Sequence, residues 1–169
     1  MFTVTVNEFV RGLKSLDHVL EKAAAFADAK KIDEKVLVTT RLYPNMLPLV
    51  KQVQIACDAA KFCAGKIAER SDIPKHEDNE QTLSELRTRV GKVIAYLQTF
   101  KPEDFVGKEN VKVAISFMPG KYLPAKEYAL NMTIPNFYFH ITMTYAILRN
   151  LGADLGKMDY LGEVNFRDL

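Results

Sequence analysis

The sequence has no tryptophan and only two cysteines among its 169 residues. Cys57 and Cys63 lie six positions apart on one expected helix, roughly 240° around its axis, so they point to different sides and cannot pair with each other. Two free thiols suit a reducing compartment, and we therefore expect a cytoplasmic protein.

Several chemical signatures are also missing. No glycine-rich phosphate loop precedes a helix and there is no Gly-x-Ser-x-Gly elbow, so neither hydride transfer on a Rossmann fold nor serine hydrolysis on an α/β sheet has support. The net charge of +2 comes from interspersed acidic and basic residues, which argues against nucleic acid as a partner. The N-terminus does not resemble a signal peptide and no stretch approaches membrane-spanning length, so we expect no membrane association.

What is present is the composition of an ordinary globular domain. Apolar residues make up 48% of the chain and charged residues 26%. These values are close to globular averages, and the chain is long enough to bury a real core. We expect a single domain over residues 1–169.

Apolar residues recur at helical spacing in four segments, which predicts an all-α protein. The segments span residues 5–29, 46–70, 83–97 and 133–151. Thr5 with Glu8, and Thr82 with Glu85, have the spacing of capping boxes, in which a hydroxyl and a carboxylate satisfy free amide groups at a helix start.

Other residues mark the ends of the second and fourth helices. Pro48 is tolerated because it falls in the first turn of the second helix. Thr133 is expected to cap the fourth helix, and Gly152 to follow its last residue.

The segment between the third and fourth helices has a period of two instead. Residues 111–116 alternate between apolar and polar side chains, and Pro119 with Gly120 supplies a turn before a second strand over residues 122–130. Pro124 removes one amide donor, which suits an edge strand. The predicted fold is therefore an all-α four-helix bundle with a small β-hairpin inserted between helices three and four.

Residues 71–81 are polar, mostly acidic and without periodicity, which predicts an exposed loop. His76 lies among its acidic residues and superficially resembles part of a metal cluster. A mobile acidic loop is the better interpretation, because nothing in the sequence preorganises these ligands.

The most informative residue is His140, which lies within a helix-length run, residues 137–148, that carries no formal charge. A helix that is apolar on nearly every side is normally central and buried. The imidazole must then have a hydrogen-bond partner or stay neutral.

Polar residues on two of the expected helices could meet His140. Asn136 and His140 share a face of the fourth helix, since they are four residues apart. Gln54 and Asp58 share a face of the second helix. If these faces meet, Gln54, Asp58, Asn136 and His140 form a polar ligand pocket inside the bundle.

Three interpretations of this patch are open. His140 could be a structural residue bonded to Thr144 or Asp58. It could bind a small ligand, or it could hold a divalent ion together with Asp58. Asp58 has a simpler explanation as half of a surface pair with Lys61 or Lys51, and Cys57 is best explained as a small buried core residue.

Four motifs carry a resemblance to a known superfamily. They are YPNMLPLVKQVQ from Tyr43 to Gln54, DAAK from Asp58 to Lys61, LRNLG from Leu148 to Gly152, and GKMDYLG from Gly156 to Gly162. Together they resemble an uncharacterised branch, a domain of unknown function, of the DinB/YfiT-like four-helix-bundle superfamily. The resemblance covers essentially the whole chain and implies an up-down-down-up topology.

The resemblance also suggests where a metal would lie. Metal-binding members carry one histidine on the second helix and a His-x-x-x-His pair on the fourth. In this chain the pair falls on Asn136 and His140, and the second helix offers Gln52, Gln54 and Asp58 without a histidine. Since one of the three expected histidines is present, we expect no resident metal ion and no other cofactor.

The sequence thus favours a non-metal small-ligand binding or interaction protein, with a degenerate pocket around His140 and dimerisation through a helix face. The competing hypothesis is a divalent-metal-dependent enzyme, of the thiol-dependent transferase or hydrolase type, that uses His140 and Asp58 with waters completing the shell.

Overall fold

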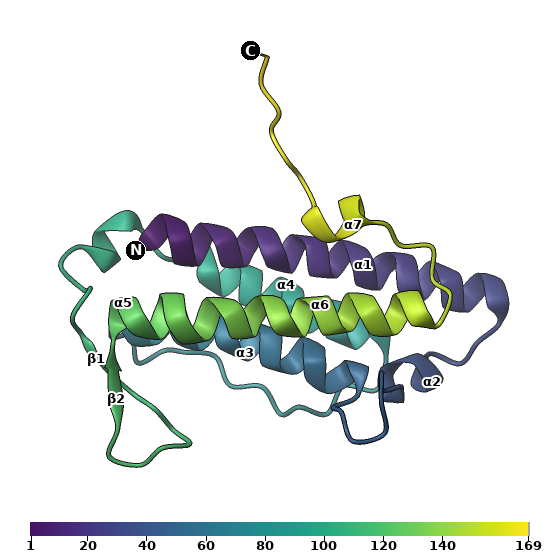
Figure 1. Ribbon diagram of the computed structural model, residues 1–169, viewed down its shortest axis with the longest axis horizontal. Coiled ribbons are helices and arrows are strands. Elements are labelled where there is room, and N and C mark those ends of the chain that lie inside the picture. The colour runs from purple at the N-terminus through teal and green to yellow at the C-terminus, as the bar shows by residue number, and fades with distance from the viewer. Residues whose placement is uncertain (169) are drawn as a thin grey trace.

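A computed structural model describes residues 1–168, in which long helices lie side by side along the main axis of the molecule (Figure 1). The contacts between them pair α3 with α6, α1 with α4, and α3 with α4. These helices are α1 (Glu8–Lys30), α3 (Leu49–Ile67), α4 (Leu83–Leu97) and α6 (Ile134–Asn150). The protein is therefore mostly helical, as the periodicity predicts.

Shorter elements connect and extend these helices. Two strands, β1 (Lys112–Ala114) and β2 (Tyr122–Pro124), pair antiparallel with Val113 opposite Leu123. The remaining elements are η1 (Thr3–Asn7), α2 (Glu34–Thr39), η2 (Pro102–Phe105), α5 (Ala125–Glu127), η3 (Tyr128–Thr133) and α7 (Lys157–Leu161). The predicted hairpin is confirmed, but its second strand is shorter than expected because the chain turns helical at Ala125.

The predicted helix caps have different outcomes. Thr82 and Glu85 form the expected capping box at the start of α4. Thr5 and Glu8 do not form one, because the helix has already begun upstream with the π-helical segment η1. The Thr5 hydroxyl instead donates to the carbonyl of Met1. Thr133 caps nothing, since it is itself helical and continues η3 into α6.

The second long helix is shorter than its apolar pattern suggests. Pro48 has an extended conformation, with φ −70° and ψ 164°, and serves as the N-cap of α3. The helix therefore begins at Leu49 rather than Met46, because residues before a proline are disfavoured in helical conformation. The preceding connection also contains the short helix α2, which the sequence did not predict.

The core is built from apolar stripes that face one another. On α1 the buried stripe includes Phe9, Leu13, Leu16 and Leu20. Gly12 in the same stripe allows α6 to approach closely, because a Cβ atom there would lie 2.6 Å from Cε1 of Phe137. Glycine costs about 1 kcal/mol relative to alanine in a helix, and here the cost is offset by this contact.

The C-terminal part folds back onto α1. Gly152, with φ +100°, follows α6 as predicted. Asp159 of α7 then accepts hydrogen bonds from Lys22 and His18 of α1, at 3.1 and 2.9 Å. The residues that follow the last long helix therefore pack against α1. Within residues 1–168, no helix is both long and apolar enough to span a membrane.

Candidate functional site

His140 lies on α6 and meets Gln52 of α3. Nδ1 of His140 is 2.7 Å from Oε1 of Gln52, and the two residues are only 7% and 2% exposed. The hydroxyl of Thr144 donates to the backbone carbonyl of His140, not to its ring. His140 is thus hydrogen-bonded to Thr144, as one interpretation held, but only through its backbone, and the partner of its ring is Gln52 rather than Asp58.

The amide of Gln52 decides which nitrogen of the ring carries the proton. Its Nε2 donates to the carbonyl oxygen of Leu47 at 3.0 Å, so its Oε1 is the atom that faces His140. An amide oxygen can only accept, so the neutral ring carries its proton on Nδ1 and keeps a lone pair on Nε2. Burial lowers the pKa of His140, which favours this neutral form.

The Nε2 atom of His140 has no hydrogen-bond partner among residues 1–168, and it is not completely buried. The ring of Phe139, which is 52% exposed, lies edge-on to the imidazole with centroids 5.2 Å apart. Gln52 therefore orients the ring and leaves its second nitrogen without a hydrogen bond.

Gln54 and Asp58 face α4 instead of α6. Gln52 and Gln54 are two residues apart on one helix and so point roughly 200° apart around its axis. Nε2 of Gln54 donates to Glu80 at 2.7 Å, and Asp58 accepts from Arg89 at 2.8 Å. Neither side chain is bonded to His140.

Asn136 lies one turn before His140 on α6 and is exposed. The sequence places it correctly on the same helix, but its side chain projects into solvent rather than into a shared polar interior. The prediction that Gln54, Asp58, Asn136 and His140 form one pocket is thus wrong. The structure separates them into a Gln52–His140 pair, an exposed amide, and a charged cluster around Arg89.

This charged cluster joins α3, α4 and the segment between them. Arg89 is 2% exposed and donates to three carboxylates, those of Asp58, Asp78 and Glu80. Lys61 is equally buried, with its Nζ 2.8 Å from Asp58. We call these residues, together with Gln54 and His76, the Arg89 cluster.

Charge pairing governs the titration of the Arg89 cluster. Burial raises the pKa of Glu80, but hydrogen bonds from Gln54 and Arg89 outweigh it and hold the pKa below its ordinary value. Asp78 behaves in the same way, with Arg89 as the main partner. The carboxylates of Glu80 and Asp78 are therefore ionised near neutral pH, and each is paired with Arg89.

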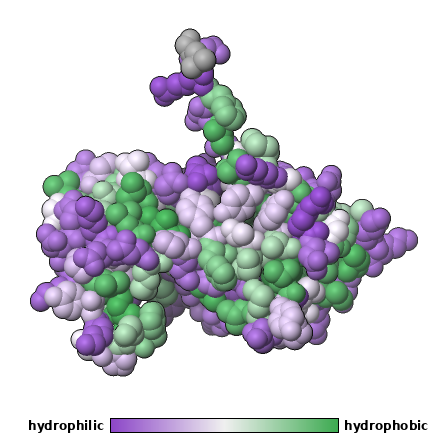
Figure 2. Space-filling model, in the orientation of Figure 1, coloured by the Kyte–Doolittle hydropathy of each residue, from purple (hydrophilic) through white to green (hydrophobic). Residues whose placement is uncertain are grey.

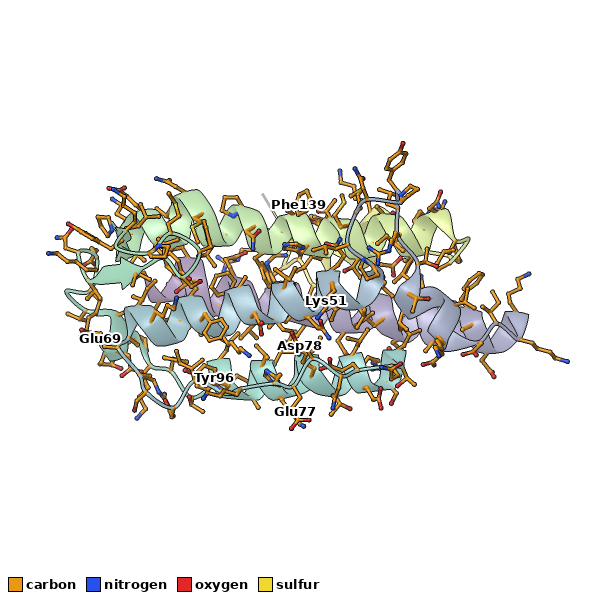
Figure 3. All side chains as sticks on the ribbon, turned by 90° about the horizontal axis from the view of Figure 1, so that it is seen from below. Lys51, Glu69, Glu77, Asp78, Tyr96 and Phe139 are labelled. Carbon is orange, nitrogen blue, oxygen red and sulfur yellow. The ribbon has the colours of Figure 1, made fainter. Side chains whose placement is uncertain are left out.

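The acidic segment 71–81 is fixed by this cluster. Figure 3 shows it running along α3 and α4, with Asp78 beside Lys51. Nδ1 of His76 lies 2.7 Å from Nζ of Lys61, an ammonium group that can only donate, so Nδ1 accepts and the ring is neutral. The interpretation of a mobile loop around His76 is corrected, because buried cations on both helices preorganise it.

The two cysteines are core residues, as predicted. Both are free and buried. Burial raises the pKa of each thiol, Cys57 and Cys63, to about 12. A thiol with such a pKa is protonated at neutral pH and is a poor nucleophile.

The side chains around His140 do not fit a resident metal ion. The ring offers one nitrogen, Nε2, and its partner Gln52 is a neutral amide, which is a weak ligand. Asp58, the second ligand of the metal hypothesis, is already paired with Arg89 and Lys61. Throughout the described residues 1–168, no three His, Cys, Asp or Glu side chains are grouped so that they could hold a metal.

A separate groove of about 810 Å³ opens along α1. Its walls come from residues 2–18, from residues 97–100 at the end of α4, and from residues 158–165 of α7 and the tail. His140 does not line it. The groove and the Gln52–His140 pair are therefore distinct features.

Sequence reasoning missed Arg89 and Glu80 and assigned Gln52 no role of its own. Arg89 lies on the buried face of α4 between Leu86 and Val93, and a charged residue at an apolar position was the signal that could have found it. No such signal in the sequence distinguishes Gln52 from Gln54 as the partner of His140. It depends on how α3 is rotated against its neighbours.

Comparisons with known proteins agree with this fold. Residues 1–161 match a family described as "Domain of unknown function (DUF1993)". A crystal structure of a DinB family member protein from Shewanella denitrificans, at 1.83 Å resolution, is 41% identical with a TM-score of 0.94. The match covers 99% of this chain and 95% of that chain. Comparison with curated proteins gave no match.

Proposed function

The chain belongs to the DUF1993 family, a DinB-like domain of unknown function, and on that premise we propose that it binds a small polar ligand without a resident metal. The observation that carries this proposal is the hydrogen bond of His140 to Gln52. It holds a neutral imidazole with its proton on one nitrogen and an oriented lone pair on the other.

The chemistry of the pair defines the ligand class. A bare Nε2 accepts a hydrogen bond, so the ligand carries an N–H or O–H donor. Phe139 beside the ring supplies an exposed aromatic surface for an apolar part of the same molecule. A small amide, alcohol or amine with an apolar portion matches both features.

The alternative, a divalent-metal-dependent enzyme using His140 and Asp58, is supported less well. The two residues have different partners on different sides of α3, and the carboxylate of Asp58 is neutralised by Arg89 and Lys61. A metal there would have to displace both cations from their carboxylate. One imidazole nitrogen alone makes a weak and unselective site.

Two substitutions separate ligand binding from a purely structural role of the ring. His140→Asn retains a donor near the position of Nδ1 but removes Nε2. His140→Gln does the reverse, since its amide extends to the position of Nε2. The probe is a library of small amides, alcohols and amines, screened by chemical-shift changes in two-dimensional NMR spectra.

We expect some library members to shift the His140 ring signals of the native protein. Their affinity for the His140→Asn variant should be at least tenfold lower. His18→Asn, which changes an exposed histidine of α1, should leave their affinity unchanged. If no library member perturbs the His140 ring, or if His140→Asn binds as well as the native protein, the proposal fails.

Elemental analysis of protein purified without a histidine tag tests the metal alternative. We expect substoichiometric metal and no gain in melting temperature when Zn²⁺, Ni²⁺ or Mn²⁺ is added. A near-stoichiometric metal that is lost in His140→Ala would contradict the proposal and favour the enzyme.

We also propose that α1, α3, α4 and α6 form a four-helix bundle with the up-down-down-up topology of the superfamily. The path of residues 71–81 along α3 supports it, because such a return crossing makes α3 and α4 parallel (Figure 3). A cytoplasmic location is proposed on the two free thiols.

A further inference from the structure

The C-terminal tail, residues 163–168, leaves the body of the protein and carries exposed apolar side chains. Figure 1 shows it extending away from α7, and Figure 2 shows hydrophobic residues along it. Phe166 is 83% exposed and Val164 is 43% exposed. The backbone N–H of Phe166 donates to the carbonyl of Val164 at 3.1 Å, which makes a tight turn around Asn165. If this turn opens into an extended chain, the two side chains point to the same side, since they are two positions apart.

The groove along α1 begins where this tail begins. Phe2, Val6 and Val10 line one wall at four-residue spacing, and Leu97 and Phe100 line the other. Val6, Leu97 and Phe100 are buried, so the floor of the groove is apolar. A volume of about 810 Å³ is ample for two apolar side chains and their backbone.

The tail is directed out of its own groove. Gly162 has φ +70° and ψ −150°, and a Cβ atom at this position would collide with the hydroxyl of Ser15. The direction of the chain is therefore set by a close contact that only glycine allows. No glycine or proline follows before residue 169, and the β-branched Val164 favours an extended conformation at its own position.

We propose that this tail binds the α1 groove of a second copy of the chain, so that two copies exchange tails in a symmetric dimer. Each groove adjoins the root of its own tail, as Gly162, Glu163 and Asn165 line it. A two-fold axis close to Gly162 of both copies, where the tails begin, then brings each tail to the groove of the other copy. Six extended residues reach about 20 Å, enough to cross between adjacent grooves.

Charge agrees with this occupant. Lys14 is exposed on the rim of the groove, which Arg11 and Asp159 also line, while the tail carries Glu163, Arg167 and Asp168, a net charge of −1. Val164 and Phe166 would lie on the apolar floor, with the carboxylates toward the rim. This proposal does not depend on His140 or on its ligand.

Cross-linking between two single variants tests the exchange. Val10→Cys places a thiol in the groove and Phe166→Cys places one on the tail. Cys57 and Cys63 do not compete, since both are buried and burial raises the pKa of each to about 12. After mild oxidation, an equimolar mixture should give a covalent species of twice the chain mass.

A matched mixture uses Phe117→Cys in place of Phe166→Cys, because Phe117 is a similarly exposed phenylalanine, at 71%, in the turn of the hairpin. This mixture should give at least tenfold less of the covalent dimer. Equal yields from the two mixtures would overturn the proposal.

Light scattering on the full chain gives an independent measure. We expect twice the chain mass at micromolar concentrations, and a single-chain mass for a chain that ends at Gly162 or carries Phe166→Asp. A monomeric full chain, or a dimer that persists after truncation, contradicts tail exchange. An internal disulfide formed within monomers of the Val10→Cys, Phe166→Cys double variant also contradicts it, because the tail would then bind its own groove.

Discussion

Oε1 of Gln52 accepts a hydrogen bond from Nδ1 of His140 across the interface of α3 and α6, at 2.7 Å. The same amide donates to the carbonyl of Leu47 in the segment that precedes α3. One side chain thus links α6, α3 and the loop before it. We therefore expect the pair to affect stability through Nδ1 of the ring and, in the proposed function, ligand binding through Nε2.

Replacing Gln52 by methionine removes both of its hydrogen bonds at nearly constant volume. The Nδ1–H of His140 and the carbonyl of Leu47 then lose their partner, and we expect a loss of about 1–3 kcal/mol in the free energy of unfolding. Gln98→Met, at an exposed position after α4, should change it by less than about 0.5 kcal/mol. Urea unfolding of both variants measures the difference, and equal values would mean that the pair contributes nothing to stability.

Arg89 offers a sharper test of buried charge. Arg89→Met leaves Asp58, Asp78 and Glu80 without their shared cation, and removing one partner of a buried ion pair costs about 3–5 kcal/mol. Since Asp58 and Asp78 are partly exposed, we expect the lower end of that range.

Arg87→Met is the matched control on the same helix. Its partners Asp17 and Glu21 are 34% and 58% exposed, so the cost should be about 0–1 kcal/mol. Chemical denaturation compares the two, and hydrogen exchange should show faster exchange of residues 71–81 in Arg89→Met alone. Unchanged exchange in this segment would contradict its attachment by Arg89.

Stability should fall in mildly acidic solution because two histidines are neutral in the folded protein. Burial, together with the positive charge of Lys61, lowers the pKa of His76 below its ordinary value of 6.5, and burial alone lowers the pKa of His140. The unfolded chain therefore binds protons more readily than the folded one. Stability is full above about pH 6.5 and declines as the pH falls through the lower folded pKa values.

Urea unfolding between pH 7.5 and 5 checks this decline. His76→Asn keeps an acceptor for Lys61 but cannot titrate, so the variant should lose part of the pH dependence, and the double change with His140→Asn should lose most of it. A native protein with constant stability over this range would show that neither ring is held neutral.

The two helical glycines of α1 and α4 should respond oppositely to alanine. Gly12→Ala brings a Cβ atom against Phe137, and such overpacking costs about 1–3 kcal/mol. Gly91→Ala meets nothing within 4 Å and should stabilise α4 by up to about 1 kcal/mol. The melting temperatures of the two variants show whether each change stabilises or destabilises. A lower melting temperature for Gly91→Ala would contradict the open space around Gly91.

The cysteines should react slowly in the native protein. Since burial raises the pKa of Cys57 to about 12, little thiolate is present at pH 8 and a reagent has no access. We expect no rapid reaction with an aromatic disulfide reagent, and full reaction of both thiols in urea. A rapid phase that is lost in Cys57→Ala would identify an open path to the core.

Much of the fold follows from local patterns in the sequence. The apolar spacing of Phe9, Leu13 and Leu16 specifies a buried helix face, and Thr82 with Glu85 specifies a helix start, because both depend on residues within one or two turns. Two of the predicted helix caps are wrong, because neighbouring residues extend the helix past them. Thr5 and Thr133 are suitable caps by type, yet each lies inside a helix that had already begun upstream.

The candidate site shows the same division more strongly. The sequence by itself determined that His140 is buried, that it lies on the last long helix, and that a set of three histidines is absent. Only the tertiary structure decided that Gln52 rather than Gln54 or Asp58 meets it, and that Arg89 gathers the acidic segment. The physical reason is that helical periodicity gives the angle between residues on one helix, whereas the rotation of that helix against its neighbours is set by packing of the whole core.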